Sequence, residues 1–233
     1  MLRAGMLFSL GCFLATACSR PGMETGVDPL EFEAPPEGVP VEAWAHALSA
    51  HRMASLQGQT DSPLLTLIDF SRPATERRLW VVNVITRHVL LTEYVAHGQH
   101  SGGLWATRFS NRDGSNQSSL GTFITATTYR GVRGLSLRLR GLEPGINDNA
   151  MDRAVVIHGA SYVSSRVVAA YGRLGRSWGC PALDRRVSRS IIDRIQGGSA
   201  VFAYYPDARW LARSRFLHCG QRLASGVVSA ARP

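Results

Sequence analysis

The chain of 233 residues is long enough for one domain of ordinary size with short extensions. Its hydrophobic fraction of 45% is normal for a folded protein and excludes a wholly disordered chain. The formal net charge is +9, and all 26 basic residues are arginines. Because these arginines are spread singly or in pairs, without one dense basic stretch, the composition does not favour nucleic acid as the partner. A basic surface suits an anionic membrane or an anionic polymer equally well.

The first residues have the pattern of an export signal. A short positive segment (1–3) precedes an apolar run (6–16), which is too short to span a membrane, and small residues then lead to Cys18. Residues 14–18, Leu-Ala-Thr-Ala-Cys, resemble a bacterial lipoprotein box, in which Cys18 becomes lipidated. Cleavage of residues 1–18 without lipidation is the alternative. Both routes predict a periplasmic protein, and the first adds an anchor in the outer membrane through Cys18.

The next segment is predicted to be a spacer. Residues 19–40 are rich in proline and acidic side chains, which is typical of an extended tether. Residues 41–56 place apolar side chains at near-helical spacing, so we expect a helix there that packs on the outside of the main domain. Tether and helix together occupy residues 19–60.

From residue 61 to residue 207 the pattern changes to short apolar runs rich in β-branched and aromatic residues. These runs predict strands at 64–70, 79–85, 89–95, 121–129, 135–139, 154–157 and 200–205. Helices are predicted at 164–171 and 187–195, and a long polar loop at 98–119. Many strands and few helices indicate a mainly β catalytic domain over 61–207. The arginine-rich tail, 208–233, is expected to be peripheral.

The strongest chemical pattern surrounds Cys180, in the run Gly-Arg-Ser-Trp-Gly-Cys-Pro-Ala-Leu at 175–183. A glycine directly before a cysteine leaves the thiol accessible and allows backbone N–H groups to point at a reacting carbonyl group. Cys219 lies in the tail, with no strand to hold it. In an oxidising compartment a Cys180–Cys219 disulfide is the alternative, and a bridged Cys180 is no nucleophile.

A histidine ends the apolar run 155–157 and is followed at once by Gly159. An imidazole beside a thiol accepts its proton or pairs with the thiolate, so His158 is the candidate base. A histidine satisfied by backbone groups is the alternative. His97 also follows a strand and precedes a glycine, but no cysteine motif accompanies it, so we interpret it as structural or as part of a pocket wall.

Taken together, His158-Gly159 and Ser177-Trp178-Gly179-Cys180 resemble the active-site signature of YkuD-type murein L,D-transpeptidases, over about residues 69–207. Further similar stretches lie at 121–123, 134–139 and 172–177. The resemblance implies a β-sandwich catalytic domain with a few peripheral helices. It also implies an enzyme that needs no metal or organic cofactor and acts on peptidoglycan stem peptides.

The resemblance implies roles for the site residues. Cys180 attacks the carbonyl group of an L-centre in a stem peptide, and His158 transfers the proton. Ser177 orients the imidazole or binds substrate. Backbone N–H groups at Gly179 and Cys180 stabilise the oxyanion. Gly159, Arg176 and Trp178 complete the predicted oxyanion and substrate-binding set.

Two positions depart from the commonest family pattern. Many members have histidine where Trp178 stands and arginine where Ala182 stands. Arg176 is the candidate replacement for that missing charge, and a solvated arginine is the alternative. The donor residue, the acyl acceptor and the balance between crosslinking and hydrolysis stay open.

Other classes of site fit the sequence less well. A zinc site is disfavoured because paired ligands are missing on either side, and a papain-like order places cysteine before histidine. Asp148 and Asp152 are candidate carboxylates, but turn chemistry explains the Asn-Asp-Asn run at 147–149 more simply. An L,D-carboxypeptidase and a non-catalytic wall-binding lipoprotein remain the alternatives to a transpeptidase.

Overall fold

The computed structural model describes residues 34–217. The predicted export signal, Cys18, most of the predicted tether and Cys219 lie outside the described residues, so these predictions stay predictions. Within 34–217 no helix is long and apolar enough to cross a membrane.

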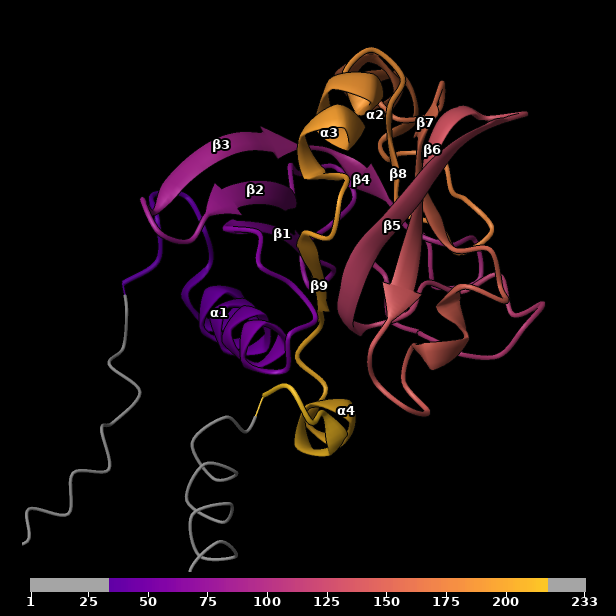
Figure 1. Cartoon of the computed structure of the whole chain (residues 1–233). Coiled ribbons are helices and arrows are strands. Elements are labelled where there is room, and N and C mark those ends of the chain that lie inside the picture. The colour runs from indigo at the N-terminus through magenta and orange to yellow at the C-terminus, as the bar shows by residue number, and fades with distance from the viewer. Residues whose placement is uncertain (1–33, 218–233) are drawn as a thin grey trace, which may run out of the picture. The chain divides into compact units, whose positions relative to one another are not determined.

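Nine strands form one continuous sheet in the order β3-β2-β1-β9-β5-β6-β7-β8-β4 (Figure 1). The strands are β1 (Leu64–Asp69), β2 (Leu79–Asn83), β3 (His88–Glu93), β4 (Val95–Ala96), β5 (Gly121–Gly131), β6 (Gly134–Gly141), β7 (Val156–Ala160), β8 (Ala182–Asp184) and β9 (Ala200–Tyr204). The helices are α1 (Val41–Leu56), α2 (Ser165–Tyr171), α3 (Ser188–Ile195) and α4 (Ala208–Arg213), with a 3₁₀ turn at Asp148–Ala150. The prediction of a mainly β fold with a few helices is confirmed.

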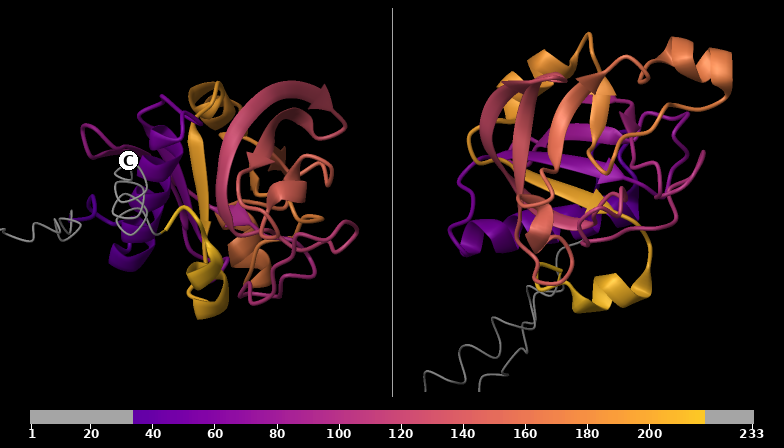
Figure 2. Two further views of the ribbon diagram at one scale, coloured as in Figure 1. Left: turned by 60° about the horizontal axis from the view of Figure 1, so that its bottom comes forward. Right: turned by 90° about the vertical axis from the view of Figure 1, so that its right-hand side faces the viewer.

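The sheet folds over into two layers. Figure 2 shows in its right-hand view that β5, β6 and β7 lie in front of β1, β2 and β9. Apolar residues from both layers, such as Leu67 on β1 and Ile157 on β7, belong to one buried core. On β1 and β9 the buried positions run consecutively, because α1 packs on these two strands as well.

The two edge strands of the sheet are neighbours in the chain. Only Tyr94 separates β3 from β4, although these strands lie at opposite ends of the strand order. The chain therefore passes directly from one edge strand of the sheet to the other. There β4 pairs with β8 in antiparallel orientation. Sequence patterns missed both β4 and β8 because strands of two and three residues carry no periodic pattern.

The helix α1 is part of the folded domain. Its residues Trp44, Ala47 and Leu48 are buried in the main core, and the helix packs on β1 and β9. The folded unit therefore begins before the boundary that we predicted at residue 61. The start of the predicted tail also packs on this core, because α4 contributes Trp210 and Phe216 follows it into a buried position.

Candidate active site

The parallel pairing of β7 with β8 brings His158 and Cys180 to the same place in the sheet. His158 pairs with Ala182, and the His158 N–H donates to the carbonyl oxygen of Pro181 (3.4 Å), the residue directly after Cys180. The Val156 N–H, two residues before His158 on β7, donates to the Cys180 sulfur (3.4 Å). His158 on β7 and Cys180, two residues before β8, are thus brought close together by the pairing of these strands.

A tight turn presents Cys180. Gly179 has φ +118°, a conformation that other residues rarely adopt, and a Cβ atom there would lie 2.9 Å from the Gln117 carbonyl oxygen. The Ser177 hydroxyl closes the turn, since it donates to the Cys180 carbonyl oxygen (2.6 Å) and accepts from the Gly179 N–H (3.1 Å). Residues 177–180 are therefore fixed by local hydrogen bonds.

This turn bears on two of the predicted roles. The Ser177 hydroxyl bonds to backbone groups of its own turn rather than to His158, so its position fits a residue that shapes the turn. The Gly179 N–H is bonded to the Ser177 hydroxyl group in this structure, and its role as an oxyanion donor stays a prediction. The N–H of Cys180 itself is the other candidate donor of this turn.

The His158 ring has a defined orientation. Its Nδ1 atom lies 3.1 Å from the carbonyl oxygen of Gly159, and a ring nitrogen that faces a carbonyl oxygen carries the hydrogen. In the neutral ring the proton acceptor is then Nε2. Burial lowers the pKa of His158, the hydrogen bond to Gly159 raises it in part, and the charge of Arg133 lowers it further.

Protein atoms surround the Cys180 thiol on most sides, although the residue keeps some solvent exposure. The thiol faces the carbonyl oxygen of Ala154 at 3.7 Å. Burial raises the pKa of Cys180, while the Val156 N–H and the charges of Arg153 and Arg133 lower it. Near neutral pH these directions favour a protonated thiol at Cys180 and a neutral imidazole at His158.

Sequence patterns did not single out Arg153, which the structure places beside the thiol. Its guanidinium donates to the carbonyl oxygens of Ser110 (2.7 Å) and Gln117 (2.7 Å) and to the hydroxyl group of Ser115 (3.1 Å). It also lies 3.5 Å from the position that a Gly179 Cβ would occupy. Arg153 therefore holds the long polar loop in place and adds a positive charge near the Cys180 thiol. In the sequence, only its position shortly before the β7 strand could have indicated this role.

A second set of hydrogen bonds connects the Cys180 turn to Ser118 and to the 97–98 segment. The hydroxyl group of the buried Ser118 accepts from the Gly98 N–H (3.0 Å) and donates to the Gly179 carbonyl oxygen (3.0 Å). The Ser177 N–H donates to the His97 carbonyl oxygen (3.0 Å). The backbone of the 97–98 segment therefore supports the Cys180 turn.

The His97 imidazole itself points elsewhere. Its Nδ1 atom accepts from the Arg78 guanidinium (2.8 Å), which also donates to the Val95 carbonyl oxygen. Arg78 is fully buried, and burial lowers its pKa to about 9. Burial, together with the charge of Arg78, lowers the pKa of His97 to about 4. His97 is therefore a neutral structural residue, in agreement with one of the two interpretations drawn from the sequence.

The remaining predicted residues occupy different surroundings. Trp178 is 71% exposed, and the Arg133 guanidinium carbon lies 6.0 Å from the centre of its ring. Arg176 donates to the carbonyl oxygens of Gln99 (3.1 Å) and Gly102 (2.9 Å), which uses its guanidinium to hold a loop. Gly159 allows close packing, since a Cβ atom there would lie 2.4 Å from the Ser188 hydroxyl oxygen. Arg133 is thus a better placed positive charge than the Arg176 of our prediction.

Residues 34–217 contain no group of three or more histidine, cysteine and acidic side chains that is arranged to hold a metal ion. The Asp148 carboxylate accepts from the Gly145 N–H (2.8 Å) and from the Asn111 amide (2.7 Å), which are turn contacts. The interpretation of Asp148 as a turn residue fits these bonds.

The chain matches the model of a known protein family. Residues 36–204 match the family described as L,D-transpeptidase catalytic domain, which covers more than half of the chain. The protein belongs to this family of enzymes. No curated protein matches.

Solved structures of L,D-transpeptidases resemble the chain at low identity. An L,D-transpeptidase from Mycobacterium smegmatis is 15% identical with a TM-score of 0.39, over 62% of this chain and 59% of that one. L,D-transpeptidase 1 from Mycobacterium tuberculosis is 13% identical with a TM-score of 0.36, over 61% and 62% respectively. The enzyme from Xylanimonas cellulosilytica is 15% identical with a TM-score of 0.36, over 70% and 78%. The chain thus covers less than two thirds of the length of the first two.

Proposed function

We propose that the protein is a peptidoglycan L,D-transpeptidase that crosslinks stem peptides through a thioester on Cys180. The observation that carries the proposal is the pairing of β7 with β8, in which the His158 N–H bonds to the carbonyl group that follows Cys180. Membership of the L,D-transpeptidase catalytic domain family supports the reaction class.

The first half of the reaction forms the thioester. Nε2 of His158 accepts the thiol proton as the Cys180 sulfur attacks the carbonyl carbon of an L-centre in the donor stem. The Cys180 N–H stabilises the negative charge that develops on the carbonyl oxygen. The C–N bond to the following D-residue then breaks, and His158 returns the proton to the leaving amine. The acyl group stays on sulfur.

The second half transfers the acyl group. An amine of a neighbouring stem attacks the thioester carbonyl, His158 accepts the amine proton, and the thiolate leaves and is reprotonated. The product is a new amide crosslink. When water attacks in place of the amine, the product is a shortened stem, as in an L,D-carboxypeptidase. The partial exposure of Cys180 admits either attacker.

The proposed location follows from the substrate. Peptidoglycan stems lie outside the cytoplasmic membrane, and residues 1–18 have the pattern of an export signal. We extend the proposal to a periplasmic protein that is anchored through a lipidated Cys18. Incorporation of labelled fatty acid into the wild type and its loss in Cys18→Ser is the expected result, and equal labelling of the two would contradict the anchor.

Muropeptide analysis tests the central proposal. Expression of the wild type in a host without endogenous L,D-transpeptidases should produce a new crosslinked species, and Cys180→Ala should remove it completely. Cys180→Ala removes the nucleophile but keeps the backbone hydrogen bonds of the turn, so the variant should fold like the wild type and serves as the inactive control. New shortened stems without crosslinks would instead indicate a carboxypeptidase. Identical profiles for the two proteins would indicate a non-catalytic wall-binding role.

A further inference from the structure

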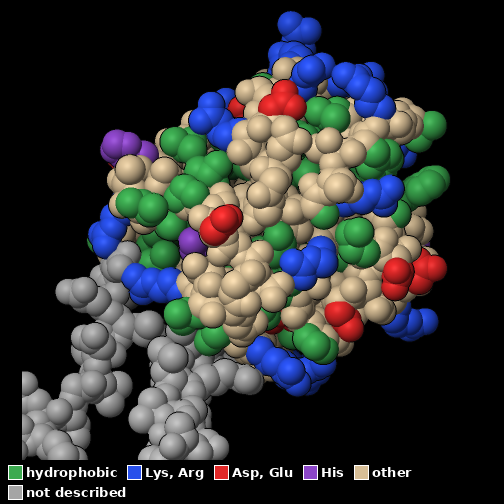
Figure 3. Space-filling view, viewed as in Figure 1, with side chains coloured by type: hydrophobic (Ala, Val, Ile, Leu, Met, Phe, Trp, Pro, Cys, Tyr) green, Lys and Arg blue, Asp and Glu red, His purple; other side chains and the backbone are tan. Residues whose placement is uncertain are grey.

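A groove of about 390 Å³ lies between the tip of the β5–β6 hairpin and the start of α3. Four arginines line it: Arg130 and Arg133 from the hairpin, and Arg185 and Arg189 from the chain that leads into α3 and its first turn. All four side chains are exposed. Figure 3 shows several basic side chains at the top of this face, the end of the molecule at which α2 and α3 lie in Figure 1.

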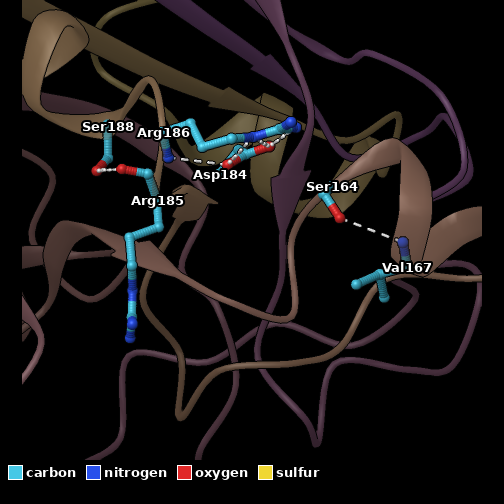
Figure 4. Close-up of polar contacts among 6 residues, drawn as sticks. All are labelled: Ser164, Val167, Asp184, Arg185, Arg186 and Ser188. Atoms are coloured by element: carbon cyan, nitrogen blue, oxygen red, sulfur yellow. Dashed lines mark hydrogen bonds and ion pairs between the residues drawn. The ribbon is translucent and has the colours of Figure 1, made fainter.

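The positive charge of the groove is largely unbalanced. No acidic residue lines the groove, and only Arg189 has an ion pair within the described range, with Asp193 on the same helix (3.5 Å). The neighbouring Arg186 shows the contrast, because its guanidinium is bonded to both oxygens of the Asp184 carboxylate. Figure 4 shows that the Arg185 side chain extends away from this pair. Several like charges gathered in one hollow raise the local concentration of anions.

The N-terminus of α3 adds to the positive electrostatic potential of the groove. The residue before the helix is Val187, which has no side-chain oxygen to cap the first N–H groups, and no acidic residue lies in the first turn. The positive end of the helix dipole therefore has no side-chain cap, and it lies beside Ser188, which lines the groove. Carboxylates are favourable ligands for such a helix end.

The groove shares two residues with the surroundings of the candidate pair. Gly159 lines it, and the carbonyl oxygen of Gly159 is the partner of the His158 ring. Arg133, at the other side of the groove, acts electrostatically on Cys180, His158 and Tyr162. The groove therefore shares Gly159 and Arg133 with the surroundings of His158 and Cys180, although neither His158 nor Cys180 lines it.

We propose that the four-arginine groove binds the carboxylate groups of the acidic peptide whose carbonyl carbon Cys180 attacks. This inference rests on the proposed function. The planar guanidinium groups match carboxylates with two parallel hydrogen bonds, and four positive charges suit a peptide with more than one free carboxylate. A lipid phosphate would use the same charges, but the groove shares Gly159 and Arg133 with the surroundings of the candidate pair, which favours a group that is carried by the substrate itself.

The test compares two double variants with the same change in net charge. Arg130→Gln/Arg185→Gln removes two arginines that face the groove. Arg166→Gln/Arg194→Gln removes two exposed arginines, on α2 and α3, that do not line it. Each protein is given a synthetic stem tetrapeptide with free side carboxylates, and the same peptide with those carboxylates converted to amides. KM and kcat of thioester formation are measured by mass spectrometry.

The wild type and the Arg166/Arg194 control should prefer the carboxylate peptide. The Arg130/Arg185 variant should lose this preference through a rise in KM of about tenfold or more, the size expected for lost charge-assisted hydrogen bonds. Its kcat and its kinetics with the amidated peptide should stay unchanged. Equal KM values for all three proteins with the carboxylate peptide would overturn the inference.

Direct binding separates this inference from the proposed function. Thioester formation by the wild type tests the proposed function by itself, whatever the arginine variants do. Calorimetry with the carboxylate peptide tests the groove even without turnover, and absence of binding by the wild type would overturn the groove proposal. Vesicles of phosphatidylglycerol serve as the second probe. Binding to these vesicles that depends on Arg130 and Arg185, without binding of the peptide, would assign the groove to a lipid headgroup instead.

Discussion

The chain contains two His–Gly pairs that follow an apolar run of sequence, and the structure gives them different surroundings. His158 ends up beside the Cys180 turn, with Nδ1 fixed by the Gly159 carbonyl oxygen. His97 is bonded through its ring to the buried Arg78, while its backbone supports the same Cys180 turn. The same His–Gly pattern therefore gives one candidate base, His158, and one structural residue, His97. The difference arises because the residues that surround each ring are set by the tertiary structure.

The largest expected effect tests the candidate base. His158→Gln keeps a polar side chain of similar length but removes the proton acceptor, so the rate of thioester formation should fall by about 10²–10⁴-fold. The thermal midpoint should change little. The measurement is single-turnover acylation followed by mass spectrometry. His97→Gln is the matched control and should keep acylation near the wild-type rate; an equal loss in both variants would contradict the distinction between the two histidines.

The glycines of the two pairs should differ in how well they tolerate a methyl group. A Cβ atom at Gly98 would lie 2.4 Å from the Asn116 carbonyl oxygen and 2.9 Å from the Gly179 Cα, both backbone atoms. At Gly159 the nearest atom is the Ser188 hydroxyl oxygen, which is a side-chain atom. Gly98→Ala should therefore cost about 3 kcal/mol and Gly159→Ala about 1 kcal/mol in unfolding free energy.

Urea denaturation measures both glycine variants. Ser188→Ala in the Gly159→Ala background removes the closest contact and should restore part of the lost stability. A Gly98→Ala protein as stable as the wild type would show that the 97–98 segment is not tightly held against the Cys180 turn.

The pH dependence of stability should report on His97. Its pKa is about 4 in the folded protein and about 6.5 in the unfolded chain, so the unfolded state binds more protons between these values. The stability that His97 contributes is full above pH 6.5 and is lost as the pH falls toward 4, by at most about 3 kcal/mol. His97→Gln retains an acceptor for Arg78 and should flatten this part of the profile. An unchanged slope between pH 6.5 and 4 would contradict the buried neutral imidazole.

The smallest expected effect concerns Arg153. Its charge lowers the pKa of Cys180, so Arg153→Gln should move the midpoint of thiol alkylation with iodoacetamide to higher pH and slow it about threefold near pH 8. Arg153→Lys keeps the charge and should restore the midpoint, although it cannot make all the loop hydrogen bonds. A faster reaction at every pH with an unchanged midpoint would instead mean that Arg153 acts only by closing the loop. Arg166→Gln is the charge-matched control.

Local patterns were sufficient for most of the fold. Short apolar runs rich in β-branched and aromatic residues predicted strands that overlap β1, β2, β3, β5, β6, β7 and β9, and helices were predicted at the positions of α1, α2 and α3. The short strands β4 and β8 and the helix α4 were missed. Their positions depend on pairing and packing with distant segments, which a short window of sequence does not contain.

The sequence by itself determined the chemistry that is available: a glycine-preceded cysteine, a strand-end histidine and a family signature that joins them. Only the tertiary structure decided which side chains meet. The pairing of β7 with β8 and the close approach of residues 97–98 to the Cys180 turn are long-range contacts. They placed His158 next to the Cys180 turn and the His97 ring against Arg78, bonded the Gly179 N–H to Ser177, and brought in Arg153 and Arg133. The physical reason is that hydrogen bonds and charges act over a few ångströms in space, whatever the distance along the chain.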